Sequence, residues 1–199
     1  SYFRFKDRPT SIRAQFFTVE MLDFLFHKFI PDLVISPCLD NSVQQNNKNT
    51  LRVGPIVRKE YEATTKTTLS GSAVVMLSGS VFGTPVKFDR QSYPFKIDVI
   101  GREKPEEWEG TKIVTFHGKI KNTEPLLRGT DLVVVNGGFS AVSEMFWMKK
   151  PLVVVPVPRH AEQWINAKTI EYLGLGLIAT QENYEDIMLN AAARIEEFR

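Results

Sequence analysis

Several features common in other protein classes are scarce in this 199-residue sequence. Its single cysteine, Cys38, excludes a framework of disulfides within the chain, fits a reducing cytoplasm and predicts a small buried side chain. The formal net charge is only +2, and no run of Lys and Arg alternates with aromatic residues, so we expect no nucleic-acid partner. No apolar run approaches the roughly 18 residues that span a bilayer. What remains is a globular protein.

The sequence has enough apolar residues for a core, because 43% of the chain is hydrophobic and 24% is charged. Its opening, SYFRFKDRPT, is not a plausible natural start, and we expect a piece of a longer protein. We divide the chain into residues 1–50 and residues 51–199. The first part predicts a helix over 11–29 and a short strand over 32–38. The helix carries one apolar face, formed by Ile12, Phe16, Val19, Leu22, Phe26 and Phe29.

The second part alternates apolar strands with helical segments. Four helical segments, at 123–130, 139–148, 161–174 and 184–198, lie between or after the later strands. Such alternation predicts an α/β fold, a Rossmann-like parallel sheet with helices on both faces. The predicted strands lie at 73–79, 95–101, 112–118, 131–137, 151–157 and 176–180.

Two glycine turns follow predicted strands. Ser78, Gly79 and Ser80 follow the first strand, while Gly137 and Gly138 follow the strand at 131–137. In open α/β sheets, ligands bind at the carboxyl ends of the strands, where helix N–H groups attract phosphate. The second turn therefore predicts an anion site made by the amides of three residues, Phe139, Ser140 and Ala141. Neither turn is a dinucleotide fingerprint or a P-loop.

Two carboxylates accompany these turns. Glu144 lies about one turn into the helix after Gly138, where it is either a solvated surface residue or an acceptor for the two hydroxyls of a ribose. Glu162 and Gln163 begin the helix that follows the next strand, and such a pair is suited to binding sugar hydroxyls. His160, just before them, is interpreted as a loop residue.

Together these residues make a specific pattern within 136–174. It consists of a glycine pair, a glutamate six residues later, P-x-x-x-x-P at 151–156, and then Glu-Gln and Asn-Ala. The pattern resembles the donor-binding signature of GT-B glycosyltransferases, a group that includes the peptidoglycan lipid N-acetylglucosaminyltransferase and the UDP-glucuronosyltransferases. The resemblance extends from the GPIVR segment at 54–58 to the C-terminal helix. Plant members carry His and Trp where this chain has Asn136 and Phe139.

The resemblance implies a role for each matching residue. The turn from Gly137 to Ala141 would bind the donor diphosphate, helped by Arg58 and by the loop of Ser78, Gly79 and Ser80. Glu144 would hold the ribose, and Glu162 and Gln163 would contact the transferred sugar. Backbone groups at Ile120 would receive the uracil edge. Residues 1–50 would be the end of an N-terminal acceptor domain, and residues 51–199 the donor domain.

The implied reaction moves a sugar from a UDP-sugar to an acceptor hydroxyl, on a lipid or a glycan, with inversion. Helix amides and Arg58 would stabilise the departing diphosphate, so the resemblance implies neither a metal nor another cofactor, and no D-x-D pair is present. The general base would lie in the absent part of the N-terminal domain, which would also make any peripheral membrane contact. We therefore expect this chain alone to bind a donor without turnover.

Three alternatives stay open from the sequence. A nucleotide-sugar epimerase shares the fold, and a non-catalytic donor-binding subunit would need a partner chain that binds the acceptor. The third is a structural α/β domain whose loops bind nothing.

Overall fold

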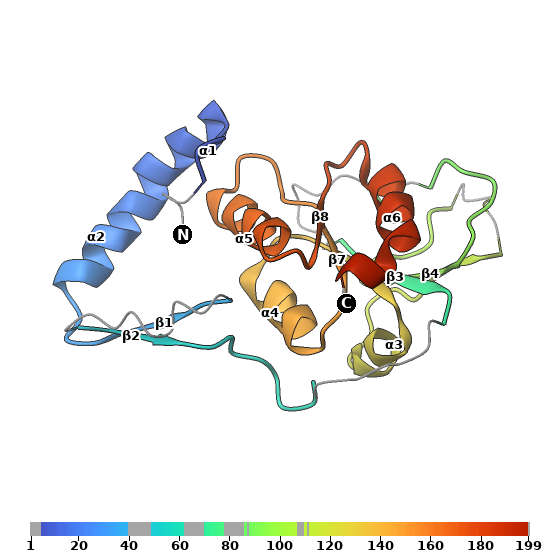
Figure 1. Cartoon of the computed structure of the whole chain (residues 1–199), viewed down its shortest axis with the longest axis horizontal. Helices are drawn as coiled ribbons and strands as arrows, with labels where there is room; N and C mark the ends of the chain where they lie inside the picture. The colour runs from blue at the N-terminus through green and yellow to red at the C-terminus, as the bar shows by residue number, and fades with distance from the viewer. Residues whose placement is uncertain are drawn as a thin grey trace.

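The computed structural model describes residues 5–39, 49–61, 70–77, 86, 88–106, 110 and 112–198. Its main body is a parallel six-stranded sheet with helices packed on both faces (Figure 1). The strand order is β5-β4-β3-β6-β7-β8, and every neighbouring pair is parallel. The predicted fold class is therefore confirmed. The strands are β3 (Ser72–Met76), β4 (Lys96–Val99), β5 (Val114–Phe116), β6 (Leu132–Val135), β7 (Leu152–Val154) and β8 (Gly176–Ile178).

Two hydrophobic clusters, one on each face, hold the sheet between the helices. Alternate residues of one strand point to opposite faces, so Val134 packs with Met188 of one helix while Val133 packs with Met145 of another. All four residues of β6 are at most 1% exposed, as expected for a strand covered on both faces. The helices are α3 (Glu124–Gly129), α4 (Phe139–Trp147), α5 (Ala161–Tyr172) and α6 (Tyr184–Ala193), followed by the 3-10 turn η4 (Ile195–Phe198).

The N-terminal segment forms a long helix and a separate two-stranded sheet, which Figure 1 shows beside α4 and α5. The helix runs through α1 (Thr10–Gln15), the π-helical turn η2 (Phe16–Glu20) and α2 (Met21–Phe29). Strand β1 (Val34–Pro37) pairs in parallel with β2 (Thr50–Val53). This pairing joins residues on both sides of our division at residue 50, and the division itself stays a prediction. Cys38 is half-buried rather than buried, and its thiol donates to the Val53 carbonyl.

The apolar face predicted for the N-terminal helix is buried only at its start. Ile12 and Phe16 pack against Ala161 and Trp164 of α5. The remaining members of the predicted face are 55–70% exposed, namely Val19, Leu22, Phe26 and Phe29. The helix contacts α5 through α1 and then diverges from it, so only the first two members of the predicted face are covered by α5 (Figure 1).

Tight packing between β7 and β8 generates a first prediction. A Cβ added to Gly176 would overlap the carbonyl oxygen of Leu152, whereas one added to Gly129 meets nothing within 4 Å. We expect Gly176→Ala to lower the free energy of unfolding by about 1–3 kcal/mol, because the strands must separate to admit the methyl group. Gly129→Ala is the matched control, with little loss of stability expected. Urea unfolding followed by circular dichroism measures both, and equal midpoints for the two variants would contradict the packing described.

Candidate functional site

The strand order places the glycine turn of residues 137–138 at the switch point of the sheet. Strand β3 lies beside β6, and the chain continues from β3 toward β4 on one side and from β6 toward β7 on the other. Ligands of open α/β sheets bind at such a point, outside the carboxyl ends of the strands. Gly137 and Gly138 follow β6 directly at that edge. The other predicted loop, Ser78, Gly79 and Ser80, lies outside the described residues.

Helix α4 begins at the turn without a side-chain cap. Gly138 is the N-cap residue, with φ −63° and ψ 133°, and no side chain among the described residues caps the first turn. Val142 is the first residue of α4 whose N–H bonds within the helix, and it donates to the Gly138 carbonyl oxygen at 3.1 Å. The predicted amides of Phe139, Ser140 and Ala141 therefore precede the intrahelical ladder. Their direction and the helix dipole suit this end of α4 to an anion.

The two glycines of the turn serve different purposes. A Cβ on Gly137 would overlap the backbone oxygen of Gln163, so this glycine lets α5 approach the turn. Asn166 of α5 donates from Nδ2 to the Gly137 carbonyl at 2.8 Å and is itself buried. Of the residues that the structure describes, none lies within 4 Å of a Cβ built on Gly138. Gly137 thus fixes the turn against α5, while no described residue crowds Gly138 in front of α4.

Asn136 helps to fix the same turn. Its Nδ2 donates to the Val155 carbonyl at 2.9 Å, just beyond β7. The side chain thereby ties the end of β6 to the end of β7.

Glu144 forms an ion pair with Arg58. Its carboxylate is buried, with the side chain 8% exposed, and receives two hydrogen bonds, from Arg58 Nε at 2.6 Å and from Arg58 Nη2 at 3.0 Å. This two-point geometry is the strong form of an arginine–carboxylate contact. The hydrogen bond to Glu144 is the main reason that the pKa of Arg58 is raised, while partial burial opposes the shift. Sequence analysis assigned these residues to ribose and diphosphate, and the structure brings them together.

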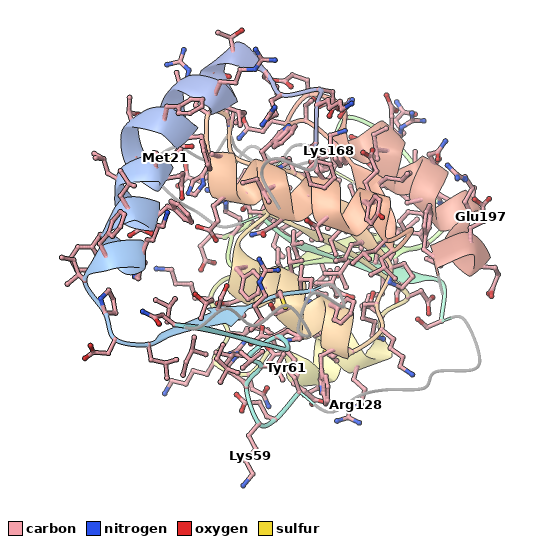
Figure 2. All side chains as sticks on the ribbon, turned by 60° about the vertical axis from the view of Figure 1, so that its left-hand side comes forward. Met21, Lys59, Tyr61, Arg128, Lys168 and Glu197 are labelled. Carbon is pink, nitrogen blue, oxygen red and sulfur yellow. The ribbon has the colours of Figure 1, made fainter. Side chains whose placement is uncertain are left out.

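Tyr61 and Thr123 hold the arginine in place, and sequence analysis did not single out either residue. The Tyr61 hydroxyl accepts from Arg58 Nη2 at 2.5 Å and shares a hydrogen bond of 2.5 Å with Thr123 Oγ1. The guanidinium also lies over the Tyr61 ring, 4.5 Å from its centroid. Tyr61 is 2% exposed, and its burial is the first cause of its raised pKa. Figure 2 shows Lys59 pointing outward while Tyr61 lies against the domain.

The other predicted contacts surround the same edge of the sheet. Ile120, which follows β5, and Phe139 are both half-buried and pack against the hydrophobic cluster that contains Tyr61. Glu162, at the start of α5, is exposed and lines a cavity of about 230 Å³ together with Phe139. Gln163 Oε1 accepts from the Val157 N–H at 3.0 Å, so this side chain fastens the loop before α5.

In the part of the chain that the structure describes, no group of three or more His, Cys, Asp or Glu residues is arranged to hold a metal ion. Within the same residues, no helix is both long enough and apolar enough to cross a membrane.

The two glycines generate a paired prediction. Gly137→Ala should lower the thermal unfolding midpoint, because the added methyl group displaces α5 from the turn. Gly138→Ala should leave the midpoint almost unchanged, since its φ of −63° suits alanine and the space is open. Differential scanning fluorimetry of both variants tests this, and a Gly138→Ala variant as unstable as Gly137→Ala would show that the turn is packed on both sides.

The chain is similar in sequence to several proteins named as glycosyltransferases. An uncharacterized glycosyltransferase of Methanosarcina mazei is 27% identical over 139 residues, which cover 65% of this chain and 37% of that protein. The chain spans less than half the length of the curated relatives it matches. All four of these relatives are glycosyltransferases by name.

Solved structures share the fold at low sequence identity. The glycosyltransferase of kitacinnamycin matches with a TM-score of 0.59 and 14% identity, covering 94% of this chain and 58% of that one. SsfS6 of Streptomyces sp. SF2575, a glycosyltransferase complexed with thymidine diphosphate, matches with a TM-score of 0.51 and 17% identity, covering 85% and 47%. The model of glycosyl transferase family 1 matches residues 15–194. The chain therefore belongs to glycosyl transferase family 1.

Proposed function

We propose that this chain is the donor-binding part of a glycosyltransferase that moves a sugar from a UDP-sugar to an acceptor hydroxyl. The observation that carries the proposal is the N-terminus of α4 at the sheet's switch point, which no side chain of the described residues caps, with the buried Glu144 on the same helix. An anion site followed by a buried carboxylate matches a nucleoside diphosphate, because the phosphates need donors and the ribose hydroxyls need an acceptor. The thymidine diphosphate held by SsfS6 supports this ligand class.

Donor binding requires Arg58 and Glu144 to exchange partners. Both Glu144 oxygens accept hydrogen bonds from Arg58, whose side chain is 53% exposed while that of Glu144 is 8% exposed. The exposed arginine moves to the diphosphate, and the carboxylate that it leaves accepts hydrogen bonds from the ribose. Arg58 exchanges the carboxylate for the charged diphosphate, and Glu144 exchanges the guanidinium for two neutral hydroxyl donors, so the buried carboxylate keeps hydrogen-bond partners.

The proposed chemistry depends on charge that grows on the leaving diphosphate as the glycosidic bond breaks. The N–H groups of Phe139, Ser140 and Ala141 point in a fixed direction before the reaction begins, and Arg58 adds a mobile positive charge. Such groups accelerate the reaction because they interact most strongly when the negative charge is greatest. The acceptor, a lipid or a glycan, and the general base that deprotonates it belong to the N-terminal domain in this proposal. The same domain makes any membrane contact, on the cytoplasmic side.

A ribose contact is tested by comparing UDP with 2′-deoxy-UDP in titration calorimetry. We expect the unsubstituted chain to bind UDP about tenfold more tightly, because a hydrogen bond to a buried carboxylate is lost with the 2′-hydroxyl. Glu144→Ala should bind both nucleotides equally. The comparison isolates the ribose, since any release of Arg58 toward the phosphates affects both ligands alike.

Glu171→Ala, at the far end of α5, serves as the control and should keep the preference for UDP. ADP, measured alongside, should bind more weakly than UDP because its purine does not fit the predicted uracil contact at Ile120. If Glu144→Ala keeps the full preference for UDP, Glu144 does not hold the ribose. If the unsubstituted chain binds no nucleotide at all, the proposed function is wrong.

A further inference from the structure

The cavity beside Glu162 has a second wall, and the residues of that wall have no role in the proposed function so far. Phe139 and two residues of α5, Glu162 and Asn166, line one side. The N-terminal segment lines the other side, with Glu20 from η2 and with the segments that contain Cys38 and Arg52. Cys38 directly follows β1, so this wall includes the carboxyl end of a parallel strand. The cavity thus lies between strand ends of one sheet and helix N-termini of the other, where ligands of parallel sheets bind.

Contacts with α5 fix the position of Glu20. The helix segment is held by Ile12 and Phe16, which pack against Ala161 and Trp164. Gln15 then links the two helices, because its Oε1 accepts from the Ala161 N–H at the start of α5. The Gln15 Nε2 donates to Glu20 Oε1 at 3.5 Å. Glu20 is therefore tied to the N-terminus of α5, beside Glu162.

The π-helical turn explains how Gln15 and Glu20 meet. In an α-helix, residues five apart do not face each other, whereas a π turn has hydrogen bonds from residue i to residue i+5. Residues 16–20 adopt this rare geometry, and Gln15 and Glu20 are five apart. Such turns occur often at functional sites. The local distortion directs Glu20 toward α5 and the cavity.

The charges around the cavity indicate which ligand groups it suits. Burial and the carboxylate of Glu162 raise the pKa of Glu20, Asp23 adds to the rise, and His160 opposes it. Two carboxylates that repel each other across a small space are stabilised by a ligand with hydrogen-bond donors. Hydroxyl groups meet this need, and the amide of Asn166 and the guanidinium of Arg52 add polar groups to the lining.

Size and position restrict the ligand further. A volume of about 230 Å³ falls below the roughly 300–1,000 Å³ of sites for drug-sized ligands and suits a single ring. Phe139, the first residue of α4, also lines the cavity, so the ring lies next to the N–H groups that face the proposed diphosphate. In a nucleotide sugar the diphosphate joins the ribose to the transferred sugar. Because the ribose is assigned to Glu144, which does not line this cavity, the ring here is the transferred sugar.

We propose that Glu20 is a specificity-determining residue that binds hydroxyls of the transferred sugar from the side opposite Glu162. This inference rests on the proposed function and deepens it. The N-terminal segment thereby becomes part of the donor site, and the sugar is held between two carboxylates carried by elements 142 residues apart in sequence. Figure 2 shows these elements side by side, the helix that carries Met21 next to α5 with Lys168.

The test separates binding of the sugar from binding of the nucleotide. Titration calorimetry gives dissociation constants for UDP, UDP-glucose and UDP-N-acetylglucosamine with the unsubstituted chain and with Glu20→Gln. We expect Glu20→Gln to raise the ratio of the UDP-sugar constant to the UDP constant about tenfold for at least one sugar, because a charged acceptor is lost. The UDP constant itself should change less than twofold. Asp32→Asn, at an exposed aspartate just after the same helix, is the matched control and should leave the ratio unchanged.

Glu162→Gln and the double variant complete the test. If both carboxylates hold one ring, the two losses are not additive, since residues that share a partner are coupled. Thermal unfolding of each variant checks that the fold is kept. Unchanged ratios in Glu20→Gln for both sugars, with normal UDP binding, would overturn this inference and leave the proposed function standing. Absence of any nucleotide binding by the unsubstituted chain would overturn both.

Discussion

The close contact between the Gly137 turn and α5 is the constraint on which the site depends. The carbonyl oxygen of Gln163 occupies the space where any other residue at position 137 would have its Cβ, and the buried amide of Asn166 bonds to the Gly137 oxygen. Because of this contact, the N-termini of α4 and α5 meet at one edge of the sheet. A larger residue at position 137 would separate the two helix ends, and with them the diphosphate and sugar parts of the proposed site. Packing and function therefore impose the same requirement at this glycine.

Most of the fold could be predicted from the sequence because its signals are local. A strand covered on both faces is a continuous apolar run, and the four buried residues of β6 can be recognised without knowing their neighbours. The glycine pair and the helix after it are equally local. Sequence analysis therefore located the six strands and the start of α4, although all six strands are shorter than the apolar segments suggested.

Long-range pairing could not be predicted in the same way. Arg58 and Glu144 are 86 residues apart, and nothing in either stretch shows that the two side chains bind each other. Tyr61 was missed because an aromatic residue in a charged segment has no recognisable pattern until Thr123 and Arg58 surround it. The helix of residues 10–29 illustrates the same limit. Its spacing identified one apolar face, but only tertiary structure shows that Phe16 is buried while Phe29 is 70% exposed.

The proposed site holds its carboxylates in two different ways. One is the ion pair of Arg58 with Glu144, and the other is the cavity lined by Glu20 and Glu162. At Glu144, a buried carboxylate is already neutralised by an arginine, so a nucleotide must replace a strong contact and gains affinity only from what it adds. At Glu20 and Glu162, two carboxylates repel each other, so a ligand with hydrogen-bond donors relieves an unfavourable interaction and adds a favourable one.

The arrangement at Glu144 favours a ligand that supplies both a phosphate and a ribose, because only such a ligand gives new partners to both members of the pair. The second favours hydroxyl groups regardless of what carries them. A nucleotide sugar meets both conditions at once, whereas a free nucleotide or a free sugar meets only one.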